Sequence, residues 1–209
     1  TVSSGYVLFY QSCQDYQDWD AAGVEQIRKG QYSAWLPAGT YRVRILPDSE
    51  TAVTSWHNAK NSCAKADVIV VGGSSMSQAL VASAGVDVTG LLTKNGQPVS
   101  FGSAVFYATC QDFLADQPSG EAMIEDGYYT LTLAPGNYRV LISVMGRNGE
   151  KYSWHSATGT CAGASPITVS GSTTANLVAR TTSTVTGSAS SSIGVLANGW
   201  LEFYATCQD

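Results

Sequence analysis

Apolar and polar residues alternate along many short segments of this chain, which is the pattern of half-buried β-strands. Gly, Pro, Asn or Asp residues that favour turns separate most of these segments. Helical periodicity is confined to Asp20–Lys29, where at most a turn or two of helix is expected. About seven short strands in each hundred residues predict an all-β chain built from β-sandwiches. The expected strands are Tyr6–Cys13, Tyr32–Leu36, Tyr41–Leu46, Val68–Val71, Val86–Gly90, Tyr129–Leu133, Tyr138–Val144, Ile167–Val169 and Trp200–Cys207, with two more carrying Trp56 and Trp154.

The alternation also predicts which side chains face the core. In the strand ending at Cys207, the face that holds Phe203 and Cys207 is apolar, whereas the opposite face carries Glu202. By this register the phenylalanines and cysteines of the related strands point inward. Three tyrosines are expected to point outward: Tyr10, Tyr107 and Tyr204.

The sequence repeats itself, and the repeat predicts the domain organisation. The segment Phe9–Asp15 returns as Phe106–Asp112 and as Phe203–Asp209, and both offsets are 97 (106 − 9 and 203 − 106). Leu36–Val43 recurs as Leu133–Val140 at the same offset, and Ser55–His57 recurs as Ser153–His155 at an offset of 98. We therefore predict a first repeat over residues 1–84, a second over 85–181, and the start of a third over 182–209.

The first of these repeats lacks an opening strand. Val86–Gly90 opens the second repeat and Thr184–Gly187 opens the third, but only five residues precede the first strand at Tyr6. An incomplete sheet exposes unpaired backbone groups that can pair with another strand. Two arrangements are open: continuation of the array in the same polypeptide, which we favour, or donation of a strand between subunits.

The residues from Gly30 to Val43 carry a family resemblance. Their pattern Gly-x-Tyr-x-x-x-Leu-Pro-Ala-Gly-x-Tyr-x-Val resembles the carboxypeptidase regulatory-like (prealbumin-like) repeats of bacterial surface proteins and the related B-type pilin (CnaB-like) domains. The resemblance implies an Ig-like or prealbumin-like sandwich in a spacer, stalk or adhesion role. B-type pilin domains also suggest a Lys–Asn isopeptide bond. That bond is disfavoured, because Lys94 lies in a turn and Asn176 has no Asn counterpart in the first repeat.

The five cysteines predict one disulfide in each complete repeat. Cys13 and Cys63 are 50 residues apart, and Cys110 and Cys161 are 51 apart, so both members of each pair recur together. Cys207 would then pair with a residue beyond Asp209. Free thiols and zinc ligation are weaker alternatives, because no Cys-x-x-Cys spacing occurs. Disulfides place the protein in an oxidising compartment, outside the cell or on its surface.

Composition limits the classes of partner that the chain is expected to bind. Only 13% of the 209 residues are charged, the net charge is −5, and no cluster of Lys and Arg occurs, so no nucleic-acid partner is expected. The apolar runs are too short to span a membrane as a helix.

No catalytic residue, metal ligand or cofactor is predicted. His57 and His155 each follow a tryptophan, but no nucleophile motif accompanies them, and core tryptophans with structural histidines are favoured. Asp15, Asp18 and Asp20 could ligate calcium, although a solvated loop is favoured. Four aromatic side chains are candidates for a ligand or interface surface: Tyr10, Tyr107, Tyr204 and Trp35.

We therefore expect a non-catalytic extracellular array: a surface stalk, an adhesin shaft or a fibre subunit. Its partners would be neighbouring repeats or subunits of the same protein. The alternative is an accessory module that binds carbohydrate, such as a surface glycan, or another ligand.

Overall fold

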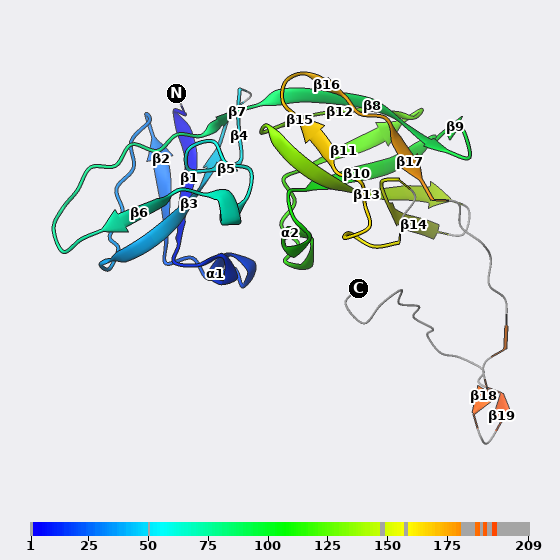
Figure 1. The fold of residues 1–209 in the computed structure, drawn as a ribbon, viewed down its shortest axis with the longest axis horizontal. Coiled ribbons are helices and arrows are strands. Elements are labelled where there is room, and N and C mark those ends of the chain that lie inside the picture. The colour runs from blue at the N-terminus through cyan, green and yellow to red at the C-terminus, as the bar shows by residue number, and fades with distance from the viewer. Residues whose placement is uncertain are drawn as a thin grey trace.

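The fold is given by a computed structural model, which describes residues 2–49, 51–146, 149–156, 159–180, 187–188, 190–191 and 194–195. It is all-β, as predicted, with two short α-helices, α1 (Cys13–Gln17) and α2 (Cys110–Leu114). Figure 1 shows two sheet assemblies side by side, joined by one crossing of the chain between β7 and β8. We call residues 2–84 the first half and residues 85–180 the second half. The finer prediction of tandem Ig-like sandwiches remains a prediction.

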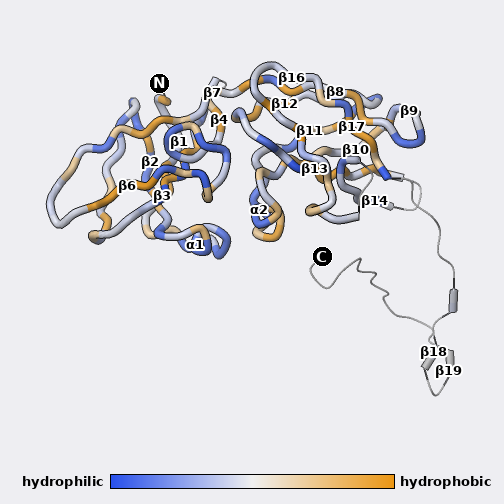
Figure 2. The backbone as a smooth tube through the Cα atoms, viewed as in Figure 1, coloured by the Kyte–Doolittle hydropathy of each residue, from blue (hydrophilic) through white to orange (hydrophobic). Residues whose placement is uncertain are grey.

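The first half contains one five-stranded sheet in the order β2-β1-β3-β5, with β6 also paired to β3. The central strand β1 pairs antiparallel with β2 on one side and β3 on the other, with Val7 opposite both Glu25 and Ile45. Figure 2 shows β6 as a continuous hydrophobic stretch. The strands are β1 (Ser4–Tyr10), β2 (Gly23–Arg28), β3 (Gly39–Pro47), β5 (Ser55–Trp56) and β6 (Val68–Val71), and η1 (Cys63–Lys65) is a short 3-10 helix.

The second half contains a larger sheet in the order β14-β13-β10-β11-β12-β8-β16, to which β9, β15 and β17 add. The strand β12 meets β11 at only one residue pair, Glu125 and Tyr128, and otherwise pairs along Tyr128–Leu133 with β8. The strands are β8 (Val86–Lys94), β9 (Gln97–Pro98), β10 (Phe101–Tyr107), β11 (Gly120–Glu125), β12 (Tyr128–Leu133), β13 (Gly136–Gly146), β14 (Gly149–Trp154), β15 (Ile167–Val169), β16 (Thr173–Thr174) and β17 (Leu177–Ala179). Outside these assemblies β4 (Ala52–Val53) pairs with β7 (Ser83–Ala84), and β18 (Ser190–Ser191) with β19 (Gly194–Val195).

Each half has two apolar clusters, one on each face of its central strand. In the first half Val7 and Phe9 of β1 pack with Val43 of β3 in the main core. In the second half Phe106 and Val140 occupy the corresponding positions, together with Leu92 of β8. The smaller clusters lie against the other face and contain the disulfides. The smaller cluster of each half must be shielded from solvent. The short helices α1 and α2, which follow β1 and β10, provide this shielding.

The prediction that Tyr10 and Tyr107 face solvent is wrong, because their side chains are 1% and 4% exposed. The strands end at these tyrosines, and the cysteines that we placed on them begin α1 and α2 instead. Helix and disulfide fold back over the face that alternation predicts to be outer. Tyr10 therefore packs against Tyr16 and Trp56, with ring centroids 5.5 and 5.8 Å apart.

Two local predictions in the first half are also wrong. The segment Asp20–Lys29 contains the strand β2 and no helix, because its residues Gly23–Arg28 pair with Ser4–Phe9 of β1. The expected strand Tyr32–Leu36 does not form, although its counterpart in the second half is β12. Tyr204, Cys207 and the strand predicted over Trp200–Cys207 lie outside the described residues. In the part of the chain that is described, no helix is long and apolar enough to cross a membrane.

Candidate functional site

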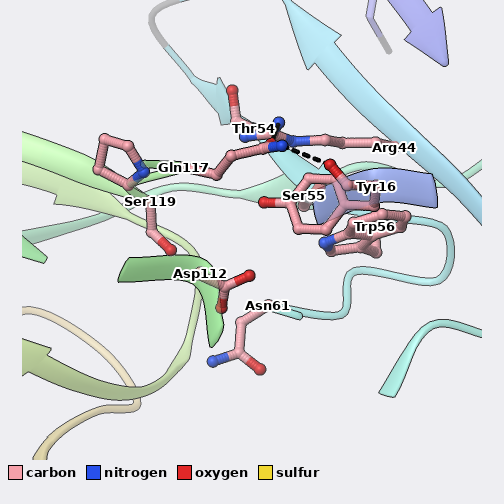
Figure 3. A pocket seen from close by; sticks show the side chains of 10 residues that line it. Tyr16, Arg44, Thr54, Ser55, Trp56, Asn61, Asp112, Gln117 and Ser119 are labelled. Carbon is pink, nitrogen blue, oxygen red and sulfur yellow. Dashed lines mark hydrogen bonds between the residues drawn. The ribbon is translucent and has the colours of Figure 1, made fainter. Parts of the chain in front are cut away.

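The candidate site is the interface where the two halves meet, between α1 and the segment that follows α2 (Figure 1). Its central residue is Gln117, whose side chain is 2% exposed. The Gln117 amide nitrogen donates to the backbone oxygen of Tyr16 at 2.5 Å, and its amide oxygen accepts from Nη1 of Arg44 at 2.6 Å (Figure 3). One buried side chain of the second half thus bonds two elements of the first.

Arg44 reaches this position because of its place in the sheet. It lies on β3 with Leu8 of β1 opposite, and its guanidinium carbon lies 5.1 Å from the ring centroid of Tyr16. A cation over an aromatic face gains electrostatic energy while its stem covers apolar surface. The residue 97 positions later is Leu141, so the second half has no arginine at this position.

Asp112 places a carboxylate beside the same ring. Its backbone N–H donates to the hydroxyl of Thr109, and that hydroxyl donates to the Asp112 carboxylate at 2.6 Å, which caps α2. The residue is 6% exposed. Burial raises the pKa of Asp112 above its ordinary value of 3.8, and the bonds from Thr109, the charge of Arg44 and the Tyr16 hydroxyl oppose that shift. Burial also raises the pKa of Tyr16.

Further contacts surround this centre. The indole nitrogen of Trp19 donates to the backbone oxygen of Ala115 at 3.2 Å, and the Asn61 amide approaches the oxygen of Asn137 at 3.4 Å. At the crossing, a Cβ on Gly85 would lie 2.3 Å from a methyl carbon of Thr132, which belongs to the second half. It would also lie 2.7 Å from a methyl carbon of Val53 in the first half, so any larger residue at this position would force both side chains to shift.

The space enclosed at the interface is small. A cavity of about 20 Å³ lies among Arg44, Trp56, Asp112 and Gln117 (Figure 3). This volume holds roughly one water molecule. The interface is therefore a packed polar joint, which we call the joint from here on, and it has no room for a sugar or a peptide.

A disulfide lies next to the joint in each half. The structure links Cys13 to Cys63 and Cys110 to Cys161, with Cα–Cα distances of 5.7 and 5.8 Å. Each bridge connects the start of the short helix to the loop before β6 or β15, so it closes the cluster around Trp56 or Trp154.

The other candidate residues lie apart from the joint. Asp15 caps α1 through the backbone N–H of Ser12, and Asp18 accepts from Gln14, so these two carboxylates have different roles. Among the described residues no group of three or more His, Cys, Asp or Glu is arranged to hold a metal ion. Asn176 accepts from the backbone N–H of Leu91.

The histidines are parts of the fold. His57 is 5% exposed, and its Nδ1 faces the backbone N–H of Val81 at 3.4 Å. The Nδ1 of His155 is buried without a partner among the described residues. Burial lowers the pKa of both side chains below 6.5.

Of the four aromatic candidates, Trp35 is 94% exposed, Tyr10 and Tyr107 are buried, and Tyr204 lies outside the described residues. Sequence reasoning did not single out Arg44 or Gln117. The sequence signal that could have identified them is a difference between the repeats, because the counterpart of Arg44 is Leu141 and that of Gln117 is Asp20.

Comparison with known proteins does not assign the chain to a family. No family model matches it, and no curated protein does. A DUF3823 family protein from Parabacteroides merdae is 16% identical over 45% of each chain, with a TM-score of 0.30. The Bacillus anthracis TIE protein is 10% identical over 86% of this chain and 30% of its own length, with a TM-score of 0.28. GBS52, the minor pilin of Streptococcus agalactiae, is 12% identical over 90% of this chain and 88% of its own, with a TM-score of 0.32. These scores establish neither a shared fold nor a function, and the resemblance inferred from the sequence remains a prediction.

Proposed function

We propose that this chain is a non-catalytic section of an extracellular structural protein, in which β-sheet repeats follow one another at fixed joints. The observation that carries this proposal is Gln117, a buried side chain bonded to both Tyr16 and Arg44 across the joint. Buried hydrogen bonds hold a geometry because a displaced donor or acceptor would lose its partner without reaching water. A chain whose halves keep one orientation transmits position and force along a stalk or fibre.

The disulfides support the same function. Under tension a disulfide prevents the residues between its cysteines from extending, and Cys13–Cys63 has a sequence separation of 50. At about 3.4 Å per extended residue, each bridge withholds about 170 Å of chain. Bridges of this kind persist in oxidising compartments, which supports a location outside the cytosol.

Residual dipolar couplings measured by NMR on the whole chain test the proposal. If the joint is rigid, amides of the first half and the second half fit one common alignment tensor. In the Gln117→Ala variant the two halves are expected to need separate tensors. Gln14→Ala, which changes an exposed residue of α1 whose side chain bonds Asp18 of the same half, should keep one tensor. Separate tensors in the unaltered protein would refute the proposal.

A further inference from the structure

Three segments of the first half are irregular where the second half has strands. Residues 32–36, 76–77 and 80–82 form no strand, whereas the residues 97 positions later belong to β12, β16 and β17. All three of those strands pair with the same neighbour, β8. One absent strand therefore accounts for all three differences.

The strand β8 contributes both hydrogen bonds and core to the second half. Its side chains Val88 and Leu92 are fully buried, and they pack with Leu133 of β12 and Leu177 of β17. Within the described residues of the first half, no strand occupies the position that corresponds to β8. None of the backbone–backbone hydrogen bonds described there involves residues 32–36.

In the first half, the two segments that correspond to the neighbours of β8, residues 32–36 and 76–82, are already linked to each other. The hydroxyl of Tyr32 donates to the backbone oxygen of Gln78 at 2.8 Å, and Tyr129 donates to Ala175 in the same way across β8. Leu36 and Leu80 stay only partly buried in the first half, whereas both of their counterparts are fully buried. The neighbouring Trp35 is 94% exposed, and its counterpart Thr132 lies opposite Asp87 of β8.

We propose that residues 32–36 and 76–82 form an acceptor site for one added β-strand, and that its occupant is a strand with the pattern of β8. The strand would run antiparallel to residues 32–36 and parallel to 76–82, as β8 runs along β12 and β17. It would present apolar side chains at the positions of Val88 and Leu92. Between them it needs glycine, because a Cβ on Gly90 would lie 2.0 Å from the oxygen of Ala175, the counterpart of Gln78.

This chain contains a second segment of related sequence, residues 183–191, which matches β8 at Val185, Thr186 and Gly187. It has Ser188 and Ala189 where β8 has two leucines, so it would bury less apolar surface. We therefore expect the occupant to be a leucine-bearing strand with the sequence pattern of β8 that does not already belong to a sheet of its own. The acceptor site does not depend on the joint, and the two proposals can fail separately.

The test adds a synthetic peptide with the sequence of residues 86–94 to the intact chain and follows amide hydrogen exchange by NMR. We expect exchange to slow by at least about tenfold at alternate amides of residues 33–36 and at residues 80 and 82, while Val81, whose N–H already bonds His57, and residues 128–133 do not change. A matched peptide that carries the Gly90→Val substitution keeps the β-propensity and should give no protection. The peptide of residues 183–191 should protect less at equal concentration.

Three results would overturn the proposal: no slowing with the first peptide, equal slowing with the valine peptide, or slowing confined to the exposed edge of β2. Equal protection by the 183–191 peptide would refute the leucine-bearing strand as the occupant. The dipolar couplings of the unaltered chain report on the joint in either case, so a failed acceptor site leaves that measurement intact.

Discussion

Replacing Gln117 with alanine is expected to weaken the joint while both sheets stay folded. The variant removes a neutral hydrogen bond to Tyr16, worth about 1 kcal/mol, and a bond from the charged Arg44, worth about 2 kcal/mol. The oxygen of Tyr16 also accepts from the N–H of Trp19, so it keeps one partner. The expected loss in the free energy of unfolding is therefore about 3 kcal/mol.

Urea denaturation followed by NMR measures this loss, because signals from each half report its own transition. With a denaturant slope of about 2 kcal/mol per molar, the urea concentration at the unfolding midpoint should fall by about 1.5 M in the half that the joint stabilises. A double-mutant cycle with Arg44→Leu, the residue found at position 141, isolates the charged bond. Its coupling energy should be about 2 kcal/mol.

The matched control is Gln14→Ala, whose hydrogen bonds to Asp18, the C-cap of α1, stay within the first half. It should change the unfolding free energy by less than about 0.5 kcal/mol and show no coupling to Arg44→Leu. A coupling energy between Gln117 and Arg44 below about 0.5 kcal/mol would refute the reasoning, because the buried contact would then contribute no more than a surface pair.

Replacing Cys110 and Cys161 together by serine should cost about 4 kcal/mol in denaturant unfolding, on the chain-entropy model for a loop of this length; an unchanged midpoint would contradict it. The pKa of Asp112 is raised in the folded protein, so above pH 3.8 the folded protein keeps the Asp112 proton while the unfolded chain loses it. The free energy of unfolding therefore decreases as the pH rises from 3.8 through the raised pKa. Asp112→Asn should remove that slope, and an identical pH profile in the variant would be the contrary result. The pKa of His155 is lowered, so the unfolded chain takes up the proton first and stability falls as pH drops below 6.5. His155→Gln should flatten this fall, as thermal unfolding measured across the pH range can show.

The sequence by itself determined the all-β class, most strand positions and the partners of Cys13 and Cys110. Strand alternation and a dense repeat are local signals, and both cysteines of a pair recur at nearly the same separation. Alternation alone could not identify what covers the second face of a strand. That face is closed by α1 and a disulfide in the first half, so Tyr10 is buried although its register predicts exposure.

Only the tertiary structure decided which residues form the joint and which segments of the first half are left without a pairing strand. Arg44 and Gln117 are 73 positions apart, and neither belongs to a motif, so only the packing of one half on the other brings them together. Residues 32–36 have the pattern of β12 but form no strand, because a strand needs hydrogen-bonding partners as well as a suitable sequence. The side-chain pattern of a segment reports its local preference for a strand, whereas strand formation also depends on whether a neighbouring strand is present to pair with it.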